Sequence, residues 1–117
     1  MKTILVVDDE EKIRDLYRGV FKQEGYKVLI APGVEEGLGL LESETVDLLI
    51  LDLWMEKRDG LDMLKEVKSK YPELKVLIVS AYPIYKDDFI TWLADDFVVK
   101  SPNLSELKEK IKKLLAN

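Results

Sequence analysis

The 117-residue sequence contains no cysteine and no histidine, and these two absences limit the chemistry that it can support. Without cysteine the chain has no disulfide, no thiolate zinc site and no cysteine nucleophile. Without histidine it lacks imidazole catalysis and the commonest metal ligand. Any metal site must therefore be built from oxygen atoms, which suit hard cations, and Mg²⁺ or Mn²⁺ is preferred where a phosphate group is also bound.

Long apolar runs and an excess of basic residues are also missing. No run approaches the roughly 20 successive apolar residues that a membrane-spanning helix needs, and no secretory signal or transit peptide is readable. The formal net charge of −5 at pH 7 argues against sequence-independent binding of nucleic acid, which depends on neutralising phosphates with lysine and arginine. We therefore expect one domain over residues 1–117, located in the cytoplasm, with no direct nucleic-acid contact and no membrane partner.

Five short apolar segments alternate with longer segments of helical period. The apolar segments are Ile4 to Val7, Lys27 to Ile30, Leu48 to Leu51, Val76 to Val79 and Phe97 to Val99. Several are apolar on both faces, as expected for parallel strands covered by helices on each side. The repeat predicts an α/β fold, a doubly wound, flavodoxin-like parallel sheet of five strands in the order 2-1-3-4-5 with five helices. The glycine-rich motifs of dinucleotide-binding proteins and P-loop proteins are absent.

The helical segments carry signals of unequal strength. The first predicted helix has five apolar residues on one face and ends near Gly25. These residues are Ile13, Leu16, Tyr17, Val20 and Phe21. The second, from Val34 to Ser43, contains Gly37 and Gly39, each of which lowers helix propensity by about 1 kcal/mol relative to alanine, so tertiary packing must hold it. We expect the fourth helix to be short or mobile.

Charged residues follow three of the predicted strands. Asp8 and Asp9 come after the first strand, Asp52 after the third and Lys100 after the fifth, while Ser80 ends the fourth. Ligands of open parallel sheets bind outside the carboxyl ends of the strands, so these side chains are predicted to form one pocket for a divalent metal and a phosphoryl group. Taken singly, each has an ordinary alternative: helix capping for the paired aspartates, turn capping for Asp52 and surface exposure for Lys100.

In this set of residues the sequence resembles the receiver domain of bacterial two-component response regulators, in particular the single-domain, chemotaxis-regulator-like members. The segment from Asp52 to Gly60 looks like the family's phosphoacceptor loop, and Ala81 is the small residue usual beside the phosphoryl site. The resemblance implies that Asp52 takes a phosphoryl group from a sensor histidine kinase or a phosphotransfer protein. It also implies that Asp9, Asp52 and the backbone carbonyl of Trp54 bind Mg²⁺, or Mn²⁺, with Asp8 assisting through water.

The same resemblance assigns roles to further residues. Lys100 would offset charge on the phosphoryl oxygen atoms, and Ser80 would donate a hydrogen bond to one of them. Ser80 and Phe97 would then form the switch that changes binding to a downstream protein target. Trp54 and Tyr82 would flank the phosphoryl group and obstruct the attacking water. The chain is accordingly expected to catalyse only its own phosphoryl transfer and a slow self-dephosphorylation.

The sequence departs from the family pattern at several positions. Phe97 stands where tyrosine is common, and Glu56 replaces a usual proline. Lys100 is followed by Ser101 and only then by Pro102, whereas the family usually has proline directly after lysine, in a cis bond. A cis bond before Ser101 would cost about 2.5 to 4 kcal/mol, so this loop either takes a different path or bears strain.

Alternative functions follow from these departures. The leading hypothesis is a stand-alone phosphoacceptor module, because no effector domain follows Asn117; in a longer natural chain the same domain would regulate a transcription factor or an enzyme. A second hypothesis is a pseudo-receiver scaffold that signals without phosphorylation. An aspartate-nucleophile phosphatase is disfavoured, because no aspartate stands two residues after Asp52.

Three aromatic residues, Tyr82, Tyr85 and Trp92, are candidates for an exposed docking patch. For Trp92 the alternative is packing into the core.

Overall fold

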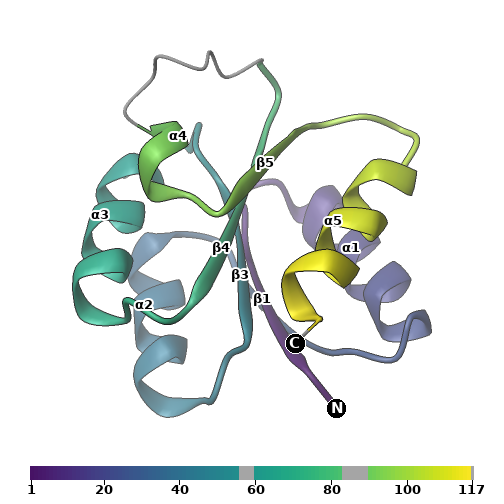
Figure 1. Ribbon diagram of the computed structural model, residues 1–117. Helices are drawn as coiled ribbons and strands as arrows, with labels where there is room; N and C mark the ends of the chain where they lie inside the picture. Colours follow the sequence, from purple (N-terminus) through teal and green to yellow (C-terminus); the bar gives the residue numbers. More distant parts are fainter. Residues whose placement is uncertain (56–59, 83–89, 117) are drawn as a thin grey trace.

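The computed structural model describes residues 1–55, 60–82 and 90–116, which form one five-stranded sheet with helices on both faces (Figure 1). The strands are β1 Thr3–Val7, β2 Lys27–Ala31, β3 Leu48–Asp52, β4 Lys75–Ser80 and β5 Asp96–Val99. All neighbouring strands are parallel, and their order is β2-β1-β3-β4-β5. The predicted order is therefore confirmed, and each predicted strand lies within one residue of its observed ends.

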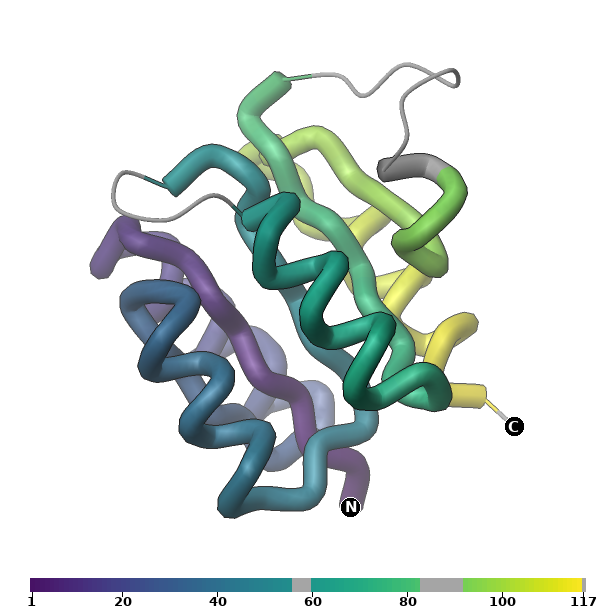
Figure 2. The backbone as a smooth tube through the Cα atoms, turned by 90° about the vertical axis from the view of Figure 1, so that its left-hand side faces the viewer, coloured from purple at the N-terminus to yellow at the C-terminus, as the bar shows by residue number. Residues whose placement is uncertain are grey.

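Two pairs of helices cover the sheet. The helices are α1 Glu11–Gln23, α2 Val34–Ser43, α3 Gly60–Lys70, α4 Ile90–Leu93 and α5 Ser105–Leu115. α1 and α5 lie on one face and α2 and α3 on the other (Figure 1), and Figure 2 shows α2 and α3 side by side in front of the sheet. β1 and β3 are buried at all five positions, so alternate residues enter two separate apolar cores. This arrangement explains why these strands are apolar on both faces.

Glycines fix two details of the packing. Gly25 has a φ of 95°, a conformation that side chains rarely adopt, and it follows the end of α1 as the sequence predicts. A Cβ atom on Gly37 would lie 2.8 Å from Val7 Cγ2 and 3.0 Å from Met63 Cε, whereas one on Gly39 would have no neighbour within 4 Å. Of these two glycines, only Gly37 lies where α2 packs closely on β1 and α3, and this packing offsets the poor helix propensity of the segment.

β5 is an edge strand whose beginning is fixed from both faces of the sheet. The Oδ2 atom of Asp95 accepts hydrogen bonds from Lys68 Nζ of α3 and from the backbone N–H of Val76, both at 2.7 Å. On the opposite face, Lys110 Nζ of α5 lies 3.1 Å from Asp96 Oδ1 and donates to the carbonyl of Phe97 at 2.8 Å. The start of β5 is thus held to one helix on each side.

Three expectations concern exposure and helix length. The described part of α4 has four residues and begins where the described residues resume, so the expectation of a short fourth helix stays a prediction. Trp92 lies on α4 and is 81% exposed, so its alternative assignment to the core is wrong. Leu16 is also exposed, although the helical spacing predicted it to be buried, because the apolar stripe of α1 is narrower than the spacing suggested.

Tyr85, the remaining aromatic residue of the predicted docking patch, lies outside the described residues. Among those that are described, no helix is both long and apolar enough to cross a membrane.

Candidate functional site

The carboxyl ends of β1, β3 and β5 bring three charged side chains together. Asp8 directly follows β1, Asp52 is the last residue of β3 and Lys100 directly follows β5. Lys100 Nζ lies 3.0 Å from Asp8 Oδ2 and 3.4 Å from Asp52 Oδ2. The parallel register makes this meeting unavoidable, because the three strands end at the same edge of the sheet.

The loop between β1 and α1 fixes the orientation of Asp8. Its N–H donates to the carbonyl of Ala31 at 3.2 Å, which extends the pairing with β2 by one residue. Its Oδ1 atom accepts the N–H of Glu10 at 2.9 Å, and its carbonyl accepts Arg14 Nη1 at 2.8 Å. Asp8 therefore shapes the turn with one carboxylate oxygen and faces Lys100 with the other.

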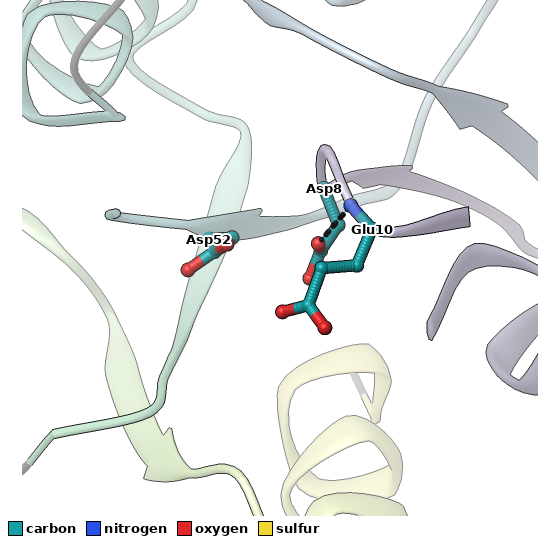
Figure 3. Close-up of side chains that lie close together, drawn as sticks. All are labelled: Asp8, Glu10 and Asp52. Atoms are coloured by element: carbon teal, nitrogen blue, oxygen red, sulfur yellow. Dashed lines mark hydrogen bonds between the residues drawn. The ribbon is translucent and has the colours of Figure 1, made fainter. Parts of the chain in front are cut away.

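Glu10 is a third acidic side chain of the pocket, and the strand-end pattern of the sequence did not predict it. Its Oε1 atom lies 3.0 Å from Lys100 Nζ. One carboxylate oxygen each of Asp8, Glu10 and Asp52 lie within 4.8 Å of one another, and Figure 3 shows the three side chains together. Asp9 is exposed and is not a member of this group as the described residues define it. The signal that could have found Glu10 was its place two residues after Asp8.

Burial makes the two aspartates of the pocket hard to ionise. Asp8 is 2% exposed and Asp52 is 3% exposed. Burial, with a further contribution from the negative charge of Asp8, raises the pKa of Asp52 to about 6 despite its contact with Lys100. Burial likewise raises the pKa of Asp8, against the hydrogen bond from Glu10 and the charge of Lys100. Each aspartate therefore ionises only against the cost of burial, and when all three carboxylates are ionised they share one ammonium.

The same surroundings favour the charged form of Lys100, whereas they disfavour the charged forms of the two aspartates. Burial by itself would lower the pKa of its ammonium, but the hydrogen bonds to Asp8 and Glu10 outweigh that effect and raise the pKa. Lys100 is therefore a permanent cation at neutral pH. Its fixed charge is available to any anionic group that comes to lie beside Asp52.

Ser80 lies next to the strand that carries Lys100. It is fully buried at the end of β4, and its carbonyl accepts the backbone N–H of Lys100 at 2.7 Å. Its Oγ atom accepts the backbone N–H of Tyr82 at 3.1 Å, and within residues 1–55, 60–82 and 90–116 its hydroxyl proton has no acceptor, so it can be donated to a ligand. Phe97, in β5, is partly buried against the core on the α2 and α3 face, with Lys110 Nζ 5.6 Å from its ring centre. Its role as a switch residue stays a prediction.

Two aromatic side chains stand at the rim of the pocket. The backbone N–H of Trp54 donates to Asp52 Oδ1 at 3.2 Å, so this residue is tied directly to the site. Its indole packs edge to face on Tyr82, with ring centres 6.3 Å apart and planes at 83°. Although they touch, Trp54 is 60% exposed and Tyr82 64% exposed. The pair therefore forms an aromatic wall that is open to solvent.

Two loops next to the pocket have backbone constraints of their own. A Cβ atom on Gly60 would collide with the carbonyl oxygen of Asp52 and lie 2.7 Å from Leu53 Cα, so α3 can begin here only with glycine. Among the described residues no peptide bond is cis. The bond between Lys100 and Ser101 is therefore trans, and this loop follows a path that differs from the usual one of the family. Glu56 lies outside the described residues.

The donor set fits a hard divalent cation. Asp8 and Asp52 are nearly excluded from water, repel each other and lie beside a third carboxylate, and neither a cysteine thiolate nor an imidazole occurs in the chain. Oxygen ligands with excess negative charge favour Mg²⁺ or Mn²⁺.

Comparison with known proteins identifies the family. The sequence matches the family model of the response regulator receiver domain over residues 4–112. The chain belongs to this family. The resemblance predicted from the sequence is therefore confirmed, and the doubly wound sheet is the receiver fold.

Solved structures of other receiver domains are closely similar. The response regulator TrrA from Thermotoga maritima, crystallised with Mg²⁺-BeF, is 45% identical with a TM-score of 0.93, and the match covers 98% of this chain and all of TrrA. TrrA in complex with the histidine kinase ThkA matches with a TM-score of 0.92. A CheY-like receiver domain from Methanospirillum hungatei is 32% identical, with a TM-score of 0.90 over 98% of this chain and 94% of that one.

Curated relatives of this receiver domain are longer response regulators. The transcriptional regulatory protein CpxR of Klebsiella pneumoniae is 35% identical over 98% of this chain. The response regulator SaeR of Staphylococcus aureus is 33% identical over the same share. The chain spans about half of each, 50% of CpxR and 51% of SaeR. The match places the chain in two-component signalling and concerns the receiver part of these relatives.

Proposed function

We propose that this receiver domain is a phosphoacceptor module in which Asp52 receives a phosphoryl group from a phosphohistidine. The observation that carries the proposal is the buried Asp52 carboxylate, 3.4 Å from the Lys100 ammonium and beside the carboxylates of Asp8 and Glu10. In the transfer, a bond forms between phosphorus and a carboxylate oxygen of Asp52 while the bond to the imidazole nitrogen breaks. Such transfer needs positioning and charge compensation more than covalent assistance.

The chain's own residues would supply most of that compensation. Lys100 is a permanent cation beside Asp52, and it would pair with a phosphoryl oxygen atom. Ser80 would donate its hydroxyl proton to another oxygen atom, because its Oγ accepts the N–H of Tyr82 and donates to no acceptor among the described residues. Mg²⁺ or Mn²⁺, held by Asp8 and Asp52, would neutralise further phosphoryl charge. Asp9 and the backbone carbonyl of Trp54 complete this ligand set by the family resemblance alone.

The partners follow from the same comparison. TrrA, 45% identical, was solved with a histidine kinase and also with Mg²⁺-BeF, which supports a sensor kinase or a phosphotransfer protein as phosphoryl donor here. We further propose a downstream protein target and no catalysis beyond the chain's own phosphoryl transfer and self-dephosphorylation. The pseudo-receiver alternative is not supported, because Asp8, Asp52, Ser80 and Lys100 are all in place.

The proposal is tested by incubation with acetyl phosphate and Mg²⁺ followed by intact mass measurement. We expect the wild type to gain one phosphoryl group, and Asp52→Asn to gain none. Asp15→Asn is the matched control, because it removes an exposed carboxylate of α1 and should leave the adduct unchanged. An adduct that persists in Asp52→Asn, or a wild type that never gains one, rejects the assignment.

A further inference from the structure

Glu10 occupies a position that local preference would give to another residue. It is the N-cap of α1, with an extended backbone (φ −88°, ψ 113°), and its carbonyl accepts the backbone N–H groups of Ile13 and Arg14 at 3.1 Å. Serine, threonine, aspartate and asparagine are favoured there, since their short side chains can bond to the free N–H groups of the first turn. Glu10 makes no such bond. Departures of this kind are expected at functional positions.

The carboxylate of Glu10 contacts Lys100 instead of its own helix. Lys100 Nζ lies 3.0 Å from Glu10, 3.0 Å from Asp8 and 3.4 Å from Asp52. The two shorter contacts both come from the loop between β1 and α1. The Lys100 side chain is only 14% exposed, whereas that of Glu10 is 60% exposed. Glu10 therefore holds the ammonium at the solvent side of the pocket.

We propose that Glu10 is a positioning residue for Lys100: together with Asp8 it draws the ammonium toward the loop between β1 and α1, so that the contact with Asp52 stays the longest of the three. This inference deepens the proposed function and rests on it. An ammonium with only Asp8 and Asp52 as partners would compete with a divalent cation for the oxygen atoms of both. Glu10 reduces that competition, because it offers the ammonium an acceptor farther from the buried carboxylates.

The test is a titration of the full chain with MgCl₂, followed through backbone amide resonances by NMR. Glu10→Gln keeps the shape of the side chain and removes its charge, and it should weaken Mg²⁺ binding by about 3- to 10-fold. Glu10→Asp keeps the charge but withdraws it by one methylene group, and it should weaken binding as well. Glu11→Gln, the next residue along the chain, is the matched control and should change the Kd by less than about twofold.

A second measurement reports on Lys100 without any metal. The side-chain ammonium resonance of Lys100 should shift in Glu10→Gln and Glu10→Asp, and should be unchanged in Glu11→Gln. An unshifted resonance in Glu10→Gln overturns the proposal, since the contact would then be absent in solution. A wild-type Kd in either Glu10 variant also overturns it, as does an equal loss in Glu11→Gln or a wild type that binds no Mg²⁺. If the wild type binds Mg²⁺ but gains no phosphoryl adduct, the proposed function is rejected. The Kd values and the Lys100 resonance of the variants then still decide whether Glu10 positions Lys100.

Discussion

Asp52 is a carboxylate held almost entirely away from water, and its ionisation opposes folding. Its pKa in the folded chain is raised to about 6, from an ordinary value of 3.8. Between these two values the folded chain binds more protons than the unfolded chain, so stability falls as pH rises through this window. The stabilisation is complete below the ordinary value and is lost above the folded one. At neutral pH the metal-free protein therefore carries an unfavourable charge at Asp52.

We expect Asp52→Asn to stabilise the metal-free protein at pH 7 by about 1 to 3 kcal/mol, because the variant removes that charge. The advantage should shrink as the pH is lowered toward about 5, where Asp52 of the wild type takes up a proton. Urea unfolding in the presence of a chelator, at both pH values, measures the difference. Parallel pH curves for the two proteins would contradict the raised pKa.

The aromatic wall of Trp54 and Tyr82 gives a prediction about the lifetime of the phosphorylated state. If these rings obstruct the attacking water, Trp54→Asn and Tyr82→Ala should each accelerate acyl-phosphate decay by about threefold or more. Loss of phosphoryl adduct with time, after removal of the donor, measures the rate. Trp92→Ala is the control, because Trp92 is an exposed aromatic residue of α4. Unchanged decay in both wall variants removes the idea.

Most of the pocket could be predicted from the sequence. Asp8, Asp52, Ser80 and Lys100 each stand at or directly after the end of a strand, and parallel strands deliver such residues to one edge. Glu10 could not be predicted in this way, because its contribution depends on the direction of a long side chain in a loop. The exposed place of Asp9, outside the carboxylate group, could not be predicted either, because the strand pattern does not fix how a loop side chain lies.

Among the helices, α2 offers an internal comparison between two glycines. Gly39→Ala should stabilise the protein by up to about 1 kcal/mol, because alanine favours a helix and its Cβ atom meets no neighbour. Gly37→Ala should destabilise it, because its Cβ atom would overlap Val7 and Met63. Urea unfolding of both variants measures the effects. Changes of the same sign would show that α2 does not pack on the sheet as described.

Gly60 links α3 to the chemistry of the pocket. Gly60→Ala should displace the backbone of Asp52 and Leu53, because the added atom collides with both. We therefore expect slower phosphorylation by acetyl phosphate as well as lower stability. Gly19→Ala is a suitable control, since Gly19 lies in α1 with open space around it. Equal phosphorylation rates in Gly60→Ala and the wild type would contradict this account.

Strands were easier to predict than helices in this chain. A buried parallel strand must be apolar at every position, so its ends are marked sharply by polar residues on both sides. Helix faces carry weaker marks, as the exposed Leu16 and Trp92 show. The glycines of the segment predicted only that tertiary packing must hold α2, and the structure shows that Gly37, not Gly39, lies at a close contact with β1.

For the molecule as a whole, cation binding and folding should be linked. A cation that binds the folded pocket alone stabilises the protein by about 1.4 kcal/mol when its concentration is ten times its Kd. We expect MgCl₂ to raise the thermal unfolding temperature of the wild type more than KCl at equal ionic strength. Asp8→Asn should reduce the difference, because it removes a carboxylate of the pocket. Equal effects of both salts on the wild type would exclude a specific site.

The two lysine contacts at the beginning of β5 have a mechanical consequence. Lys68 and Lys110 anchor one end of this strand to α3 and α5, while Lys100 at the other end is held by the acidic loop. We therefore expect a pull on Lys100 to pivot the strand about its anchored end rather than to slide it along β4. Because β5 borders the sheet and carries Phe97 and Val98, which pack into one core each, a pivot of this kind would tilt the outer edge of the domain and shift both cores there together.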